Sequence, residues 1–349
     1  MVALIDPAIE RATAVLQKKC ETFVRSAYEN TRVFKTLEDF VRNMSKKDMP
    51  RAVIVGSPPM FRGTLQPGRD IETQIMKYFP GVAMFIEKPS ATGPASEVPE
   101  AFAIAKAVAD SGTICSVGYM LRYLRAVQMM KSIIDENNLT VMATIARYAC
   151  AYEAIAKPDW WDKSKSAGPI IEQGTHFCDL SRYFGGEVDM STVSAHSLEW
   201  DENAGHLSKM SVDETAIPPE NRIPRVTAAT WCVVAPQGLW SAGVCAERVC
   251  PFAGSTTAAP SGASPTSARS RATTTVASSR CMLTATSSSE FTARRLDLHL
   301  KLTYVARLVN PYVQPVLYIR RPGSDLEETH RFPDDDPFFS EVSIPHNVG

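Results

Sequence analysis

Short β-type runs, most of them continuously apolar, constrain the first third of this chain more than any other feature. The runs occupy residues 2–5, 31–34, 52–55, 83–86 and 114–117, and helical patterns separate them at 8–19, 37–44, 71–78 and 101–111. Continuous apolar runs are typical of strands covered on both faces, and their alternation with helices favours parallel βαβ units. We therefore expect an α/β fold with a doubly wound parallel sheet over residues 1–120.

The remainder of the chain follows a different pattern. A long helix is expected at residues 122–137, followed by strands at 140–152 and 228–234, the first with partial alternation of apolar and polar residues. This order predicts an α+β domain over residues 121–349, built on an open, mostly antiparallel sheet.

Residues 240–300 differ in composition from both parts. Within 251–290, Ser and Thr make up 18 of 40 residues. Such a segment buries too little apolar surface to offset the entropy lost on ordering. Two interpretations remain open: a disordered insert, or a mis-translated stretch in which a reading frame or intron boundary was missed. We favour the second, because Ala, Ser, Thr, Arg and Pro are what GC-rich DNA encodes out of frame.

Composition limits the classes of function. The 349 residues are 44% apolar and 21% charged, with a net charge of −1, as in ordinary globular proteins, so we expect neither a nucleic-acid nor a membrane partner. The N-terminus lacks the pattern of a signal peptide, and the eight cysteines form no CxxC pair, so we expect reduced thiols and a cytoplasmic location. The histidines show no metal-ligand spacing, which predicts no metal site.

Side chains that can take up and release a proton lie at the end of one expected strand and on one expected helix. Lys88 lies within the Glu-Lys-Pro tripeptide 87–89 at the end of an apolar strand, and His176 lies between Glu172 and Asp179 on one expected helix. An amine, an imidazole and a carboxylate together can move a proton at neutral pH. The structural alternatives are a solvated strand end for Lys88, a packed histidine for His176 and a helix cap or salt bridge for Asp179.

Four stretches of sequence, taken in order, carry a resemblance to a known family. They are AVIVGSPP (52–59), FIEKPSA (85–91), SVGYMLRY (116–123) and GPIIEQGTHFCDL (168–180). Together they resemble the Gfo/Idh/MocA family of oxidoreductases, named for glucose–fructose oxidoreductase, inositol dehydrogenase and MocA. The ending PDDDPFFSEV (333–342) is most similar to fungal-type members.

The sequence departs from the family pattern in two places. In the last stretch, Ala167 replaces a Gly and Glu172 replaces an Asp of the family motif. The Gly-x-Gly-x-x-Gly fingerprint is absent from the 349 residues. In a Rossmann domain this fingerprint lies about 20 residues before the acid that binds the adenosine ribose, here Asp6. We therefore expect an incomplete Rossmann domain in a truncated gene model or fragment, lacking roughly 25 residues with the first strand and the phosphate loop.

The resemblance implies an NAD(P)-dependent oxidoreductase that transfers hydride between nicotinamide and a sugar, polyol or related hydroxyl compound. The catalytic residues that it implies are Lys88, His176, Glu172 and Asp179. The cofactor-binding residues that it implies are Asp6, Ser57, Pro58, Glu87 and Lys88. The substrate-binding residues that we add, because forked donors and aromatic faces suit polyols, are Arg122, Tyr123 and Trp161.

The expected roles follow from the chemistry of these groups. His176 would take the hydroxyl proton, Lys88 would bind the same oxygen, and Glu172 or Asp179 would orient the imidazole. Asp6 would bind the ribose hydroxyls, which favours NAD over NADP, although Arg11 keeps NADP open. A homodimer or higher homo-oligomer through the C-terminal sheet is a further expectation. Two alternatives remain: a non-catalytic NAD(P)-binding or sensor protein of the same fold, and a non-functional truncated product.

Overall fold

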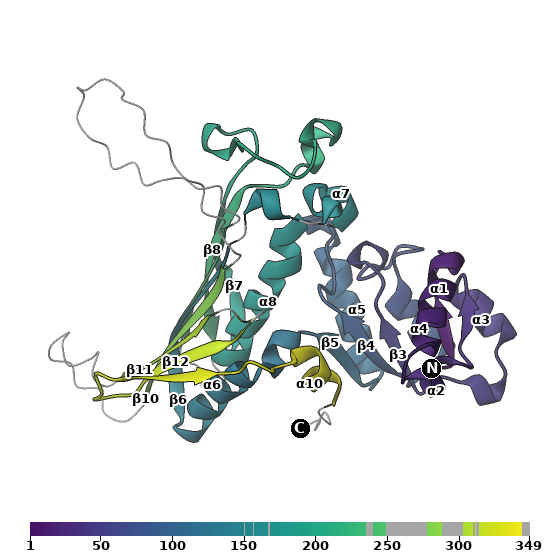
Figure 1. Ribbon diagram of the computed structural model, residues 1–349, viewed down its shortest axis with the longest axis horizontal. Helices are drawn as coiled ribbons and strands as arrows, with labels where there is room; N and C mark the ends of the chain where they lie inside the picture. Colours follow the sequence, from purple (N-terminus) through teal and green to yellow (C-terminus); the bar gives the residue numbers. More distant parts are fainter. Residues whose placement is uncertain are drawn as a thin grey trace. The chain divides into compact units, whose positions relative to one another are not determined.

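The computed structural model describes residues 1–149, 151–155, 157–166, 168–234, 240–248, 278–287, 303–309, 311 and 314–343. It divides into two compact units, 1–118 and 119–349. A Rossmann-like unit of parallel sheets comes first and a unit with a mostly antiparallel sheet follows, which confirms the predicted fold class (Figure 1).

The first unit alternates strands and helices as predicted. Its strands are β1 (Ala3–Ile5), β2 (Arg32–Phe34), β3 (Ala52–Val55), β4 (Ala83–Glu87) and β5 (Cys115–Gly118). Its helices are α1 (Ile9–Cys20), α2 (Arg25–Tyr28), α3 (Leu37–Asn43), α4 (Ile71–Tyr78) and α5 (Val98–Asp110), with 3-10 turns η1 (Lys46–Asp48), η2 (Pro59–Phe61) and η3 (Ala95–Glu97). Local signals explain several helix starts: the Thr36 hydroxyl accepts the Asp39 N–H at the start of α3, and a proline occupies the first turn of α5.

Strand pairing in this unit forms two parallel sheets. One pairs β1 with β2, and the other has the order β3-β4-β5. Both contribute to one apolar core, in which Val55, Met84 and Ile86 pack with side chains of α3, α4 and α5. On the opposite face of β3, Ile54 is 73% exposed. The expectation that every strand is covered on both faces is therefore wrong for β3, because no neighbour in the described residues covers that side chain.

The second unit is built on an eight-stranded sheet with the order β13-β12-β11-β10-β6-β9-β8-β7. The strands are β6 (Leu139–Ala149), β7 (Glu187–Leu198), β8 (Val226–Val234), β9 (Trp240–Arg248), β10 (Ser278–Ser287), β11 (Thr303–Val309), β12 (Val316–Arg320) and β13 (Glu327–Arg331). All neighbours are antiparallel except the parallel pair β6 and β9.

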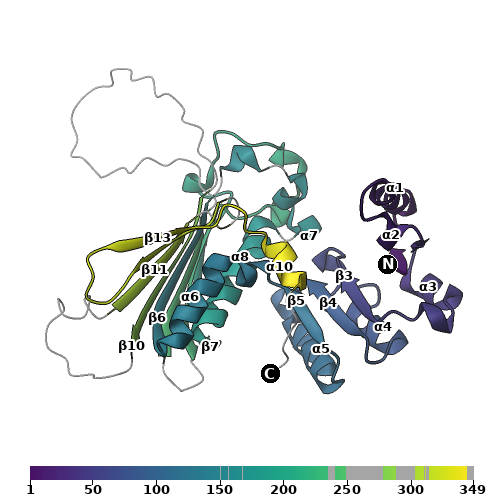
Figure 2. The ribbon, with the colours of Figure 1, turned by 60° about the horizontal axis from the view of Figure 1, so that its bottom comes forward.

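Two long helices, α6 (Arg125–Glu136) and α8 (Gly168–Gly185), pack on one face of this sheet. Two short helices, α7 (Lys163–Ser166) and α10 (Pro337–Ser343), lie against α8 and against the 3-10 turn Met120–Tyr123, respectively. The 3-10 turns are η4 (Met120–Tyr123), η5 (Tyr152–Ala154), η6 (Pro158–Trp161), η7 (Asn203–Gly205), η8 (Glu214–Ala216) and η9 (Pro219–Asn221). Figures 1 and 2 show α6 and α8 together on the same face, where Val127, Met130 and Leu180 join Leu308 and Leu317 in the core.

Segment 240–300, for which we expected disorder or mis-translation, contains two of these strands. Residues 240–248 form β9 and residues 278–287 form β10, which pairs with β6 on one side and β11 on the other. Residues 249–277 and 288–300 lie outside the described residues.

The acidic run Asp334-Asp335-Asp336 contributes a helix cap. The Asp335 carboxylate accepts the Arg125 backbone N–H at 2.7 Å, at the first residue of α6. The preceding residue, Leu124, makes no side-chain cap. A carboxylate here satisfies one N–H of the first turn and complements the helix dipole, so the chain supplies from its C-terminal part what α6 lacks locally.

Candidate active site

In the first unit, Lys88 follows β4 at the carboxyl end of the parallel sheet. Ligands bind at this end of such sheets. The Glu87 carboxylate accepts the Lys88 backbone N–H at 3.2 Å, and the Lys88–Pro89 peptide bond is cis. The Glu87 side chain therefore binds the backbone of Lys88.

Arg62, which the sequence reasoning did not select, lies directly beside this tripeptide. Its side chain is 1% exposed, and its guanidinium donates to the carbonyls of Pro89 at 2.6 Å, Lys88 at 3.4 Å and Ser57 at 3.0 Å. The loops after β3 and β4 are thus tied together by one side chain. The signal in the sequence was a lone Arg in an apolar loop, followed by Gly63.

Three other residues predicted to bind the cofactor lie at carboxyl ends of strands in this unit. Asp6 follows β1, and its carboxylate accepts the Ala8 N–H at 2.7 Å and pairs with Arg11 at 3.0 Å. The hydrogen bond from Ala8, aided by Arg11, holds the pKa of Asp6 below its ordinary value, so this acid is ionised at neutral pH. Ser57 and Pro58 follow β3, and the Ser57 hydroxyl oxygen is buried without a hydrogen-bond partner in the described part of the chain.

These features fit one end of a dinucleotide. An ionised carboxylate after a parallel strand suits ribose hydroxyls, and the exposed Asp6–Arg11 pair is weak enough to be replaced by them. The buried Ser57 hydroxyl is a polar group that a ligand at the carboxyl end of β3 could satisfy.

In the second unit, His176 lies in the middle of α8 and is 2% exposed. The ring of Tyr119 meets the imidazole edge-on with 6.3 Å between ring centres, and the Tyr119 hydroxyl lies 3.3 Å from the Thr175 hydroxyl. Tyr119 is the second residue that the sequence reasoning did not select. Its position directly after β5, in the stretch 116–123, was the available signal.

Asp179, one turn after His176, is held by Arg122. The Arg122 guanidinium donates to both carboxylate oxygens, at 2.5 and 2.7 Å, and stacks over the Tyr183 ring at 5.0 Å. Burial raises the pKa of Asp179, and the hydrogen bonds and charge of Arg122 oppose that rise. The structure thus pairs a predicted catalytic residue with a predicted substrate-binding residue.

The other predicted residues of this unit make different contacts. Glu172 forms an ion pair with Lys157 at 3.4 Å. Tyr123 ends η4, and burial raises the pKa of its hydroxyl, with the Glu341 carboxylate adding to the effect. Trp161 is 0% exposed and packs in an apolar cluster with Tyr152, so its role in this conformation is packing.

The described ranges contain no candidate membrane-spanning helix and no candidate metal site. None of the helices there is long and apolar enough to cross a membrane. Nor do those ranges contain a group of three or more His, Cys, Asp or Glu side chains placed to hold a metal ion.

Two family models cover most of the chain. Residues 1–119 match the Gfo/Idh/MocA model, described as the oxidoreductase family with an NAD-binding Rossmann fold, and residues 122–237 match an oxidoreductase C-terminal domain. Two uncharacterized proteins of Schizosaccharomyces pombe are similar over nearly the whole chain. One is 40% identical over 99% of this chain and 74% of its own length. The other is 39% identical over 98% of this chain and 78% of its own length.

Solved structures share the fold at low identity. A 3-ketoreductase from Actinomadura kijaniata, in complex with NADP and TDP-benzene, matches with a TM-score of 0.58 and 12% identity over 98% of this chain and 79% of its own. The UDP-N-acetylglucosamine 3-dehydrogenase of Acidithiobacillus ferrooxidans matches with a TM-score of 0.57 and 14% identity over 98% and 78%. The parallel sheets with Lys88 and Asp6 at their carboxyl ends, the second unit's sheet and the two family matches lead to one conclusion: this chain belongs to the Gfo/Idh/MocA family of NAD-binding oxidoreductases.

Proposed function

We propose that this protein oxidises a secondary hydroxyl group of a sugar, polyol or related compound to the carbonyl, or reduces the carbonyl, with a nicotinamide dinucleotide. The observation that carries the proposal is the placement of Lys88: it follows a parallel strand in an NAD-binding domain, and the buried Arg62 binds its backbone carbonyl. The named activities of the structural relatives, a 3-ketoreductase and a sugar-nucleotide dehydrogenase, are of the same class.

When bound, the dinucleotide supplies the carbon that accepts or gives the hydride. Asp6 would accept hydrogen bonds from the ribose hydroxyls in place of Arg11, and Ser57 and Pro58 would line the groove after β3. With both ribose hydroxyls bound, the carboxylate disfavours a 2′-phosphate and so favours NAD over NADP. Glu87 would keep the Lys88 backbone in place through the bond to its N–H.

His176 is the proposed general base. Oxidation of an alcohol requires that the hydroxyl proton leave as the hydride leaves carbon, and an imidazole can accept it at neutral pH. Lys88 would donate a hydrogen bond to the same oxygen and stabilise the negative charge that develops there. In the reverse direction the imidazolium would return the proton to that oxygen.

The polar groups around α8 would support these two residues. Arg122 and Tyr123 are the proposed substrate contacts, and Asp179 would set the direction of the Arg122 guanidinium rather than of the imidazole. Glu172 would neutralise the charge of Lys157 through their ion pair. Trp161 is not part of the proposed site, because its side chain packs within an apolar cluster with Tyr152 and Ile223.

Alanine substitutions test the two central roles. Lys88→Ala and His176→Ala should each lower kcat by about 10²- to 10⁴-fold on a panel of myo-inositol, glucose and UDP-N-acetylglucosamine with its 3-keto analogue. The affinity for NADH, measured by fluorescence titration, should change little in both variants. Lys35→Ala is the matched control, because Lys35 is an exposed lysine directly after a parallel strand of the same unit. Full turnover in Lys88→Ala would refute the role of that residue, and no turnover of any panel member by unaltered protein that binds NADH would refute the substrate class.

A further inference from the structure

Arg62 is a buried cation whose hydrogen bonds go to backbone carbonyls of two loops. Its Nε donates to Ser57 after β3, and its Nη1 and Nη2 donate to Pro89 and Lys88 after β4. The planar fork of a guanidinium can bind several carbonyls at fixed angles, whereas a lysine ammonium would not span them. The side chain therefore sets the distance between the two loops.

Burying the positive charge of Arg62 costs free energy unless a negative charge lies nearby, and the Glu72 carboxylate is close enough to interact with it. Glu72 is also buried, and the positive charge of Arg62 lowers its pKa while burial, the larger effect, raises it. Both Glu72 oxygens lie 3.2 Å from the Gly63 backbone N, next in sequence to Arg62. The carboxylate thus holds the backbone that carries the guanidinium.

Gly63 shows how closely the two loops approach. Its φ is +77°, and a Cβ added there would lie 2.5 Å from the Ser90 carbonyl oxygen and 2.8 Å from the Ala91 Cβ. Only a residue without a side chain allows this contact without displacing backbone. Backbone packing at Gly63 and the Arg62 fork therefore both act on residues 88–91.

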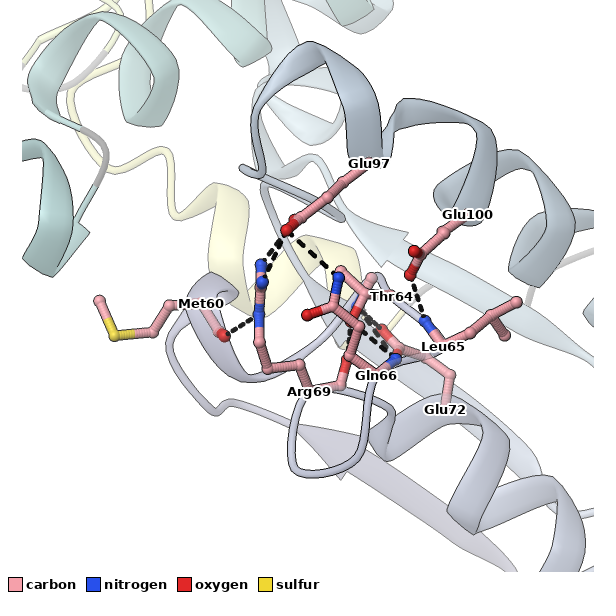
Figure 3. A network of polar contacts seen from close by, with 9 residues as sticks. Met60, Thr64, Leu65, Gln66, Arg69, Glu72, Glu97 and Glu100 are labelled. Carbon is pink, nitrogen blue, oxygen red and sulfur yellow. Dashed lines mark hydrogen bonds and ion pairs between the residues drawn. The ribbon is translucent and has the colours of Figure 1, made fainter.

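The rest of segment 57–70 is anchored at several points, as Figure 3 shows. Arg69 donates to both oxygens of Glu97, at 2.8 and 2.9 Å, and to the Met60 carbonyl at 3.0 Å. Glu100, in the first turn of α5, accepts the Leu65 N–H at 2.8 Å. A segment held in this way can act as a fixed support for the loop after β4.

We infer that Arg62 is a positioning residue for Lys88: it fixes the backbone from which the proposed catalytic amine extends. This inference rests on the proposed function for the role of Lys88. The brace, by which we mean the three hydrogen bonds from Arg62 to the carbonyls of Ser57, Lys88 and Pro89, holds the loop whatever that role is and can be measured separately. Displacement of a catalytic group by about 1 Å can lower a rate by roughly 10²-fold, so loss of the fork should reduce turnover without removing a group that contacts substrate.

Arg62→Lys tests the brace, because it keeps the charge and loses the fork. Arg225→Lys is the matched control: Arg225 is an equally buried arginine of the second unit that donates to the carbonyls of Gly205 and Ile223. Hydrogen exchange followed by mass spectrometry should show a peptide spanning 86–94 exchanging roughly tenfold faster in Arg62→Lys and unchanged in Arg225→Lys. Unchanged exchange of that peptide in Arg62→Lys would overturn the inference, whatever the activity of Lys88 variants.

A double-mutant cycle separates positioning from general destabilisation. On whichever panel compound is turned over, Arg62→Lys should lower kcat by about 10²-fold in the unaltered background and by less than about twofold in the Lys88→Ala background. Arg225→Lys should have the same effect on kcat in both backgrounds. An equal loss from Arg62→Lys in both backgrounds would contradict action through Lys88. Full activity of Lys88→Ala would instead refute the proposed role of Lys88, while the exchange experiment would still show whether Arg62 holds the loop after β4.

Discussion

The pair formed by Arg122 and Asp179 allows a quantitative prediction. The Asp179 side chain is 2% exposed and that of Arg122 34%, and two short hydrogen bonds join them. Removing one partner of a fully buried pair costs about 3–5 kcal/mol, but Arg122 can turn partly to water, so we expect about 2–3 kcal/mol for Asp179→Asn. In a unit of this size that corresponds to a fall in Tm of about 5–10 °C.

The assay is thermal unfolding followed by far-ultraviolet circular dichroism, for Asp179→Asn, Arg122→Met and the double variant. Since both singles break the same interaction, the cycle should give a coupling free energy of about 1.5 kcal/mol or more. The alternative, in which Asp179 orients His176, predicts instead that Asp179 couples to His176→Ala and only weakly to Arg122→Met. A coupling with Arg122 below about 0.5 kcal/mol would refute the reasoning, because that is within the additivity of independent sites.

Two further predictions concern buried or paired carboxylates. Burial raises the pKa of Glu72 above its ordinary 4.5. The stability that the protonated Glu72 contributes is therefore full below that pH and is lost as pH rises through the folded-state pKa. Glu72→Gln should remove this decline. Arg69 holds the pKa of Glu97 below its ordinary value, so Glu97→Gln should lower stability at neutral pH and change it little in strong acid. Urea midpoints between pH 3 and 7 test both. A stability difference between Glu72→Gln and the unaltered protein that does not change with pH would contradict the first prediction, and an unchanged midpoint of Glu97→Gln at pH 7 would contradict the second. Glu214→Gln should cost about 3–5 kcal/mol in urea unfolding because it leaves the buried Arg225 without its carboxylate, whereas Glu214→Leu with Arg225→Met should be nearly neutral; a cost below about 1 kcal/mol for the single change would contradict this.

Elements with a strong local pattern could be predicted from the sequence. The helix Ile71–Tyr78 and the strand Ala52–Val55 have the predicted bounds, because periodicity, flanking turns and core packing all agree there. The long helix expected at 122–137 proved to be the 3-10 turn η4 followed by α6. Strand β10 was not predicted, because its residues gain their conformation from pairing with β6 and β11 rather than from composition.

The partners of the candidate site residues were harder to predict, because contacts made across long sequence separations leave little local signal. Lys88 could be selected from its position after a strand, but Arg62, which binds its carbonyl, lies 26 residues earlier. Asp179 was expected, as an alternative to Glu172, to orient His176, whereas its carboxylate binds Arg122, 57 residues away. Trp161 was selected for its aromatic face, and apolar packing buries that face completely.

Transfer of a carbon-bound deuterium to the cofactor tests the central claim most directly. The protein would be incubated with NAD and with myo-inositol, glucose or UDP-N-acetylglucosamine deuterated at the ring carbons, and the reduced cofactor analysed by mass spectrometry. The account predicts one deuterium in the reduced nicotinamide from at least one compound, formed about 10²- to 10⁴-fold more slowly by Lys88→Ala and by His176→Ala. Absence of label from every compound, or undiminished transfer by both variants, would contradict it.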